Sequence, residues 1–376
     1  MRYRYYTAIL ETISPVHIGC GEKLTKLDYV YSEKSRTVYV LHPMKLFHGL
    51  QQFHLLESFE KGLPRNTSMT DFLVQNSVPE QAYASWAMYS FPSQRSVINR
   101  GQYDIQKFVK DAYGMPYIPG SGLKGALRSV LATDSVLQDA DSFRNMTGKI
   151  SSELDRYDRF KNNLLSRESS QIESDIFHTL QRNKEKKYDI VNDCMAGLII
   201  SDSSPAAKES LSLSKKIDQF RQGEENPINT LRETLKINTK LTFEITIDTS
   251  LFRFSVKEIL RAGENAFSFY DDTFRSIFLD YLPPEIDPER EMYIYLGGGT
   301  GFHHKTFLNA LFTNLPNPEQ GAECTATLLD LQFPRAKHTS FTKREGYSPK
   351  AIKMTKYEDR LEEMGLCKLR FEERKI

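Results

Sequence analysis

The chain has 376 residues, a formal net charge of +1 at pH 7, and a composition of 39% hydrophobic, 26% charged and 11% aromatic residues. These values suit a globular protein with two domains, and the near-neutral charge means that any site for nucleic acid must be local. The four cysteines form no C-x-x-C pair, which argues against a zinc ribbon or a redox motif. No signal-peptide pattern and no apolar run of roughly 18 residues occurs, so we expect a cytoplasmic protein without membrane contact.

The first part of the chain begins with strands. Residues 2–18 and 26–41 have strand patterns, and "SEKSR" within the second marks a hairpin turn. Residues 44–62 favour helix, and residues 63–110 mix short patterns with Pro, Ser and Asn. We therefore expect residues 44–110 to form a helical insertion.

A helix introduced by glycines follows in "YIPGSGLKGALRS" at residues 117–129. Residues 135–190 are polar, charged and helical in pattern, and we expect them to form a second insertion outside the main core. The first helix has a predicted buried face of four apolar residues: Leu123, Leu127, Val130 and Leu131.

Strand patterns return in the second half. "AGLIISDSSP" (196–205) predicts a short buried strand, and "LTFEITID" (241–248) and "LCKLRFE" (366–372) alternate between apolar and polar residues. "SVKE" (255–258) is a capping box that opens a helix. Strands with one apolar face are typical of antiparallel sheets covered by helices on one side, whereas doubly wound parallel sheets have strands that are apolar on both faces. We therefore predict an α+β fold made of two units.

The glycines at 120, 122 and 125 spell G-x-G-x-x-G, the outline of a dinucleotide-binding turn. That site also requires a second strand that ends in an acid about 20 residues later. Residues 131–145, "LATDSVLQDADSFRN", have no strand pattern, so a dinucleotide is excluded and we expect no cofactor.

The same motif still suits an anion. Ser121 lies where an N-cap is expected, and the first turn of a helix offers free N–H groups and a positive dipole end. Lys124 and Arg128 follow one turn apart, which favours a phosphate. The alternative is that the glycines only form a tight turn and that both cations are solvated.

A second glycine run, "LGGGTGFHHKTF" at residues 296–307, resembles a P-loop. Counted from Gly299, the Walker pattern requires glycine where His304 stands, so an ATP-hydrolysing P-loop is excluded. The backbone can still approach a ligand closely, with His303 and Lys305 beside it. A bulge or loop without a ligand is the alternative.

Positive charge is concentrated in residues 335–356, where seven cations accompany one acid, Glu345. Phe341 and Tyr347 lie between the basic residues, a pattern that suits single-stranded nucleic acid. A solvated loop is an equally good interpretation of this segment alone. The cations are Arg335, Lys337, Lys343, Arg344, Lys350, Lys353 and Lys356.

Taken in order, five motifs resemble one family, the RAMP superfamily of CRISPR RNA-binding proteins. More narrowly, they are similar to the subunit at the crRNA 3′ end of type III-A (Csm) effector complexes. The resemblance extends over nearly the whole chain but is weak in the two insertions. The motifs are "ISPVHIGCGEKL" (13–24), "YIPGSGLKGALRS" (117–129), "GLIISDSSP" (197–205), "LGGGTGFHHKT" (296–306) and "MGLCKLRFE" (364–372).

The resemblance implies two ferredoxin-like (RRM-like) units with glycine-rich loops, at residues 1–230 and 231–376. It implies a non-catalytic subunit without a metal that caps the 3′ end of the guide and is needed for crRNA 3′-end maturation and complex assembly in antiviral defence. Its implied partners are the 3′ region of the crRNA, the backbone and small subunits of the Csm complex, target RNA indirectly, and host nucleases that trim the crRNA. The implied RNA-binding residues are His17, Gly19, Ser121, Lys124, Arg128, Gly299, Gly301, His303 and Lys305.

The competing interpretation is an enzyme. Some RAMP proteins cut precursor crRNA without metal by means of a histidine, and the candidates here are His17, His303 and His304. Asp28 is a candidate for metal-dependent cleavage of target RNA, although one carboxylate without a partner is a weak metal signal. We expect neither activity.

Overall fold

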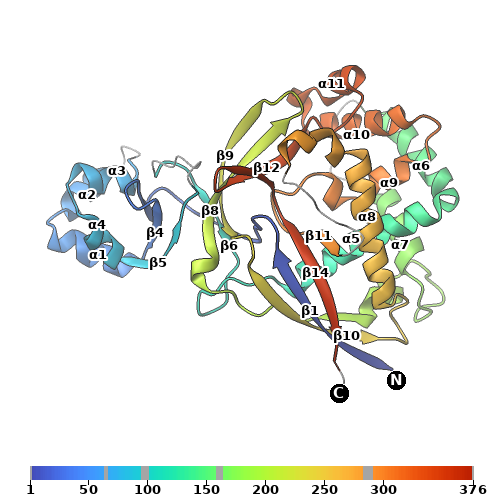
Figure 1. Ribbon diagram of the computed structural model, residues 1–376, viewed down its shortest axis with the longest axis horizontal. Coiled ribbons are helices and arrows are strands. Elements are labelled where there is room, and N and C mark those ends of the chain that lie inside the picture. The colour runs from blue at the N-terminus through green and yellow to red at the C-terminus, as the bar shows by residue number, and fades with distance from the viewer. Residues whose placement is uncertain (1, 63–66, 95–100, 158–163, 283–290, 375–376) are drawn as a thin grey trace.

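The computed structural model describes residues 2–62, 67–94, 101–157, 164–282 and 291–374. Its central layer is a five-stranded antiparallel sheet, the first sheet, in which β1 and β14, from the two ends of the chain, lie side by side (Figure 1). The order is β11 (Met292–Tyr295), β14 (Leu366–Glu373), β1 (Tyr3–Thr12), β10 (Lys240–Asp248) and β7 (Leu198–Ile200).

Alternation along the strands explains how this sheet packs. In β10 every second side chain is buried, from Leu241 to Ile247, as the sequence predicts. Helices α5 (Gly120–Gln138) and α8 (Val256–Thr273) pack together beside the sheet, and the predicted buried face of α5 is confirmed at its leucines. The predicted capping box at the start of α8 is confirmed, with Ser255 and Glu258 each bonded to the other's backbone N–H.

The second sheet has six strands. Its one parallel pair is β6 with β9, and the other pairings are antiparallel, so the prediction of antiparallel sheets is correct except for this pair. The strand order is β13 (Arg360–Glu363), β12 (Ala351–Tyr357), β8 (Leu211–Phe220), β9 (Glu225–Leu235), β6 (Ile105–Phe108) and β2 (Gly19–Leu24).

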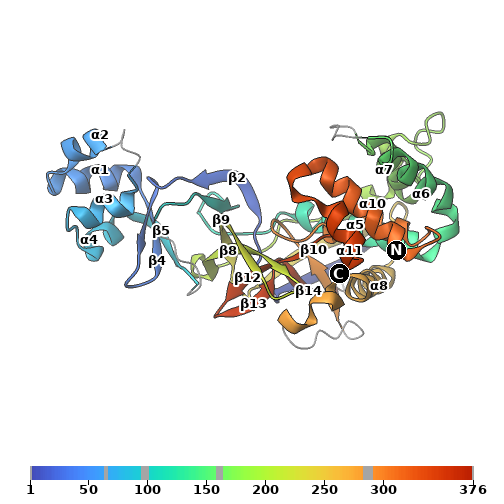
Figure 2. The same cartoon turned by 90° about the horizontal axis from the view of Figure 1, so that it is seen from above.

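A helical lobe extends from the rest of the molecule, as Figure 2 shows. Its core is a separate apolar cluster that includes Trp86 and Leu73. The lobe contains the expected helices of residues 44–62, whereas residues 63–66 and 95–100 of the insertion lie outside the described residues. It consists of β3 (Tyr29–Ser32), β4 (Thr37–Leu41), β5 (Ala87–Pro92), α1 (Pro43–Gln52), α2 (Leu56–Gly62), α3 (Met69–Gln75) and α4 (Glu80–Ser85).

The second predicted insertion forms helices α6 (Ala140–Leu154) and α7 (Ser166–Phe177). The expectation that it lies outside the main core is wrong, because Ile150 and Phe177 belong to the largest buried apolar cluster. These helices pack beside α5 and near α9 (Leu308–Phe312) and α10 (Pro318–Gln332). Their charged residues dominate the sequence pattern, but the apolar residues spaced at helical intervals decide the packing.

The first sheet draws strands from both sides of residue 230, since β1 and β7 pair with β10. The division into units at residues 1–230 and 231–376, and their ferredoxin-like character, stay predictions. Among the described residues, no helix combines the length and the apolar character that crossing a membrane requires.

Candidate nucleic-acid interface

His17 lies just after β1, in the middle of the candidate site. Its side chain is almost fully buried, and its Nδ1–H donates to the backbone oxygen of Glu233 at 2.8 Å. Burial lowers the pKa of His17 to about 4, so the imidazole is neutral near pH 7. The ring is therefore held as a fixed structural group in the neutral form.

The glycine run at residues 296–307 and Gly19 meet at this histidine. The backbone N–H of Gly298 donates to the His17 carbonyl at 2.7 Å. Gly297 has φ +80°, and a Cβ there would lie 2.1 Å from the same carbonyl oxygen, so only glycine fits. A Cβ on Gly19 would lie 3.1 Å from His17 Nε2. His17, Gly19 and the loop that contains Gly299 and Gly301 are thus brought together.

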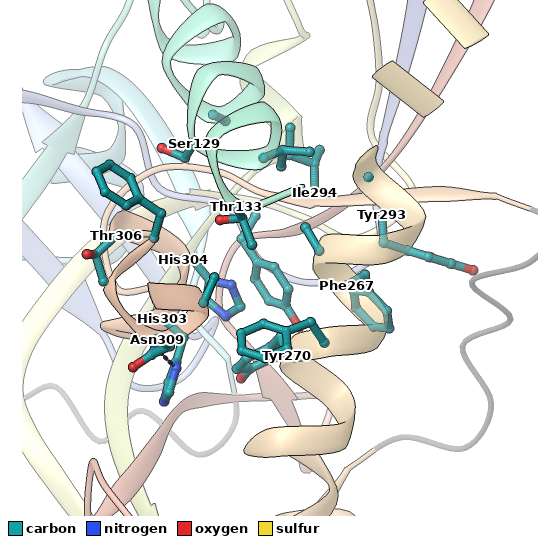
Figure 3. Close-up of a pocket in the computed structure, with 18 residues that line it drawn as sticks. Ser129, Thr133, Phe267, Tyr270, Tyr293, Ile294, His303, His304, Thr306 and Asn309 are labelled. Atoms are coloured by element: carbon teal, nitrogen blue, oxygen red, sulfur yellow. Dashed lines mark hydrogen bonds between the residues drawn. The ribbon is translucent and has the colours of Figure 1, made fainter. Parts of the chain in front are cut away.

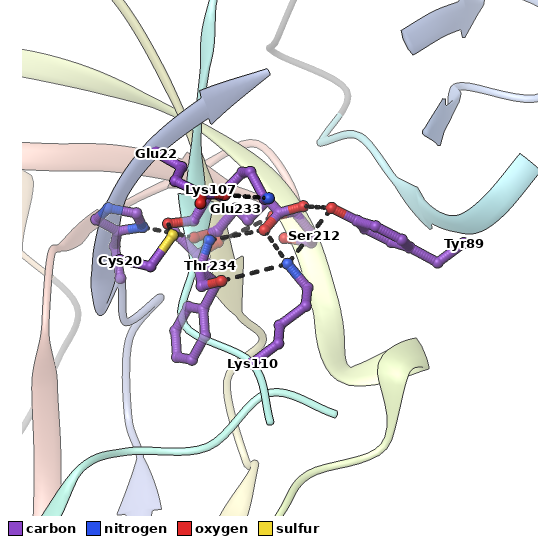
Figure 4. A network of polar contacts seen from close by, with 10 residues as sticks. Cys20, Glu22, Tyr89, Lys107, Lys110, Ser212, Glu233 and Thr234 are labelled. Carbon is purple, nitrogen blue, oxygen red and sulfur yellow. Dashed lines mark hydrogen bonds and ion pairs between the residues drawn. The ribbon is translucent and has the colours of Figure 1, made fainter. Parts of the chain in front are cut away.

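Glu233 connects this loop region to the helical lobe (Figure 4). Its carboxylate is fully buried and accepts hydrogen bonds from Tyr89 Oη at 2.6 Å and from the Phe108 N–H at 2.7 Å. Lys110 forms an ion pair with the same carboxylate. A buried carboxylate with this many partners fixes the strands that hold it.

Next to Glu233, Arg232 forms the centre of a group of positive charges. Arg232 on β9 lies opposite Ser214 on β8, and Ser214 is two residues before Lys216. The positive charge of Arg232 lowers the pKa values of Lys216 and Lys305. Burial itself is the larger cause of both shifts, and burial alone lowers the pKa of Arg232. Within the described part of the chain, Arg232 Nη1 is buried without a hydrogen-bond partner. We call Arg232, Lys216 and Lys305 the cation cluster.

The cation cluster has the electrostatics of an anion site. Like charges in a half-buried setting repel each other and lose hydration, and a bound phosphate relieves both effects. Lys305 projects from η6 (His303–Lys305), directly after the glycine-rich loop, and remains partly accessible to solvent. Glycine-rich backbone and a cation therefore face the same region.

The start of α5 differs from the prediction. Pro119, not Ser121, is the N-cap, and the Gly120 N–H donates to Asp202 Oδ1 at 2.9 Å. The prediction that Ser121 caps this helix is therefore wrong, and the chain's own carboxylate occupies the first amide. Asp202 comes from "SDSSP", so this motif positions the helix start.

Arg128 is engaged within the chain. Its guanidinium forms ion pairs with Asp193 at 2.7 Å and Glu173 at 3.0 Å and lies over the ring of Phe177. These contacts join α5 to α7 and neutralise the charge. By contrast, Lys124 has no hydrogen bond or ion pair to the residues that the structure describes, and burial lowers its pKa.

Two glycines of α5 face open space. A Cβ on Gly122 or Gly125 would meet no atom within 4 Å, and both residues are exposed. Each glycine within a helix costs about 0.5–1 kcal/mol relative to alanine. The packing of the described residues gives no reason for that cost, so these positions leave room for a backbone approach from outside.

His303 and His304 lie in an aromatic cluster (Figure 3). His304 stacks on Tyr295 at 3.5 Å between ring centroids, and His303 lies 4.3 Å from Phe274 and is hydrogen-bonded to Asn309. Burial lowers the pKa of His303 to about 3 and that of His304 well below its usual range. Both rings are neutral near pH 7. They line a cavity of about 60 Å³, which is too small for a nucleotide, and also a larger one of about 590 Å³.

The remaining candidates are held in local structure. Asp28 accepts hydrogen bonds from the N–H and the hydroxyl of Thr25. No group of three or more His, Cys, Asp or Glu residues suited to a metal occurs in the described ranges. In the basic segment, Phe341 and Tyr347 are buried, so they are not the exposed stacking surface that the interleaved pattern favours.

Arg232, Lys216 and Asp202 belong to the candidate site, although they are not among the residues predicted from the sequence. A basic residue in a strand pattern does not by itself indicate a binding site, since its side chain can equally face water. Only the pairing of β8 with β9 places Arg232 near Lys216. For Asp202, the position between a strand and a helix-start motif was the available signal.

Comparisons with known proteins identify the family of the chain. The family model of the RAMP superfamily matches residues 9–302. A Streptococcus thermophilus protein described as CRISPR system Cms protein Csm5 is 30% identical over 315 residues, covering 81% of this chain and 80% of that protein. The chain belongs to the RAMP superfamily and, within it, to the Csm5 family. This membership confirms the resemblance indicated by the motifs.

Further matches cover almost the whole of both chains. A Mycobacterium tuberculosis Csm5 protein is 26% identical over 388 residues, which cover 96% of both chains. The crystal structure of T. onnurineus Csm5 has a TM-score of 0.58 at 19% identity, covering 96% of this chain and 99% of that one. A chain of a Csm–crRNA–target RNA ternary complex of a type III-A CRISPR-Cas system has a TM-score of 0.59 at 19% identity. The match covers 97% of this chain and 100% of that one. These two structures support the α+β fold.

Proposed function

We propose that this Csm5-family chain is a non-catalytic RNA-binding subunit of a type III-A CRISPR complex. It binds the 3′ region of the crRNA, caps the end of the guide, and supports crRNA 3′-end maturation and complex assembly. Its partners are the crRNA, the backbone and small subunits, target RNA indirectly, and the nucleases that trim the guide.

One observation carries the proposal: the cation cluster lies beside a glycine-rich loop that is fixed by His17. The contacts of such a site go to phosphate and sugar and do not depend on base sequence. Lys124 and the open glycines of α5 provide a second exposed region suited to a nucleic-acid backbone or a neighbouring subunit.

The state of the histidines supports the absence of catalysis. A general acid or base near pH 7 needs a pKa near that value. Burial lowers the pKa of His17 to about 4 and that of His303 to about 3, and both rings are hydrogen-bonded within the protein. These rings are suited to fixing the loop.

The deciding experiment measures binding of the purified chain to labelled single-stranded RNA of guide length, with chelator, across a salt series. We expect affinity to fall with salt and no cleavage products. Specific products from repeat RNA that disappear in His17→Ala or His303→Ala would establish the endoribonuclease alternative instead.

Capping is tested in reconstituted complexes with and without the chain, exposed to a 3′-to-5′ exonuclease. We expect the chain to protect the last nucleotides of the guide. Equal trimming in both complexes would contradict the capping role while leaving RNA binding intact.

A further inference from the structure

A larger cavity adjoins the cation cluster. It has a volume of about 590 Å³ and lies between the glycine-rich loop, strands β8 and β12, and the segment from α10 to α11 (His338–Glu345). This volume falls in the range of small-molecule sites of roughly 300–1,000 Å³. Its walls combine lysines of the second sheet with aromatic rings.

The charges around the cavity leave an excess of positive charge. Asp218 forms ion pairs with Lys353 at 2.9 Å and Lys216 at 3.6 Å. Glu363 is engaged by Arg275 and by two tyrosine hydroxyls. Lys305 and the neighbouring Arg232 have no carboxylate partner among the described residues, so the entrance suits a phosphate.

Other parts of the lining suit a flat, largely apolar ring. Phe333 lines the cavity with 55% of its surface exposed, and Phe302 and Ile352 line it as well. His338 also lines it, and its Nδ1 is buried without a hydrogen-bond partner within the described ranges. A base has two apolar faces and a polar edge, which match an aromatic ring and an unpaired imidazole nitrogen.

We propose that this cavity takes one nucleotide of the bound RNA, turned out of the strand, with its phosphate at the cation cluster and its base against Phe333. The inference rests on the proposed RNA-binding function and adds a site to it. Because a base is recognised mainly through stacking, the site accepts several bases and fixes the register of the strand.

The test is an abasic scan. Guide-length RNAs that each lack one base are bound to the wild-type chain and to Phe333→Ala, with Phe47→Ala as control, since Phe47 is an exposed phenylalanine on α1. We expect one position at which base removal weakens wild-type binding about tenfold. In Phe333→Ala that position should become equivalent to the others, while Phe47→Ala keeps the wild-type pattern.

Four results would overturn the inference. Equal affinity for all abasic RNAs, with tight binding of intact RNA, rejects the pocket and keeps the proposed function. A Phe333→Ala scan identical to wild type rejects the placement of the base. Competition by adenosine monophosphate together with a flat scan indicates a site for free nucleotide. Absence of binding to intact RNA rejects the proposed function and the pocket with it.

Discussion

Arg232 and Arg128 show how the surroundings decide what an arginine does. Arg128 has two carboxylates and an aromatic ring around its guanidinium, so it joins two helices. Arg232 is half-buried beside two lysines, with one nitrogen unpaired. A residue in this second setting destabilises the empty protein and binds an anion well.

We therefore predict that Arg232→Gln weakens RNA binding about tenfold, because it removes a charge-assisted contact to phosphate. The slope of log affinity against log salt should become shallower by about 0.7. Fluorescence anisotropy with labelled RNA measures both quantities.

The matched control is Arg344→Gln, since Arg344 is exposed and forms its ion pair with the adjacent Glu345. It should leave binding unchanged. Thermal unfolding of Arg232→Gln should show undiminished stability. Wild-type affinity in Arg232→Gln would contradict a phosphate role for the cation cluster.

His17 predicts a pH dependence of stability. Its pKa falls from 6.5 in the unfolded chain to about 4 in the folded one, so the unfolded state binds more protons between these values. The contribution of His17 to the free energy of unfolding is therefore complete above pH 6.5. Roughly 3 kcal/mol of it is lost as the pH falls to about 4. Urea unfolding of wild type and His17→Asn across this range measures the effect. We expect a flatter profile in the variant, and parallel profiles would show that His17 is not the group responsible.

At the scale of the element, α5 contains glycines of two kinds. A Cβ on Gly120 would lie 2.3 Å from the Ser201 carbonyl oxygen, so this glycine is required for packing. Gly122 and Gly125 face open space. The sequence motif treats the three alike, and only the structure separates them.

We predict that Gly122→Ala and Gly125→Ala each raise the free energy of unfolding by about 0.5–1 kcal/mol, because alanine restricts the unfolded chain and fits the helix. Both should weaken RNA binding or incorporation into the complex. Gly148→Ala in α6 is the control, because its Cβ also meets nothing within 4 Å. Gly148→Ala should raise the free energy of unfolding and leave RNA binding and assembly unchanged. Denaturant unfolding and pull-down with the other subunits distinguish these effects, and normal assembly of the α5 variants would show that this face is free.

Elements were predictable where a local pattern decides them. The alternation of β10 and the capping box of α8 are set by neighbouring residues. The packing of α6 and α7 was not predictable, because a few apolar residues among many charges decide it. The cation cluster was missed for a related reason: it combines β8, β9 and η6, which are distant in sequence.

At the scale of the whole molecule, Tyr89 couples the helical lobe to the second sheet through Glu233. We predict that Tyr89→Phe costs about 1–2 kcal/mol, because it removes a hydrogen bond to a buried carboxylate. Hydrogen exchange should become faster in β3 and β4 than in the first sheet. Tyr39→Phe is the control, since Tyr39 bonds to Glu80 within the lobe. Equal exchange in both variants would contradict the coupling.

Glu233 serves two regions at once, since its carbonyl holds His17 and its carboxylate holds Tyr89 and Lys110. A mutation that removes the carboxylate leaves Lys110, which is only partly exposed, without its counter-ion. A substitution of Glu233 is therefore expected to destabilise the protein unless Lys110 is replaced as well. We expect lineages of the Csm5 family to keep these three side chains together or to replace them together, as one inherited unit.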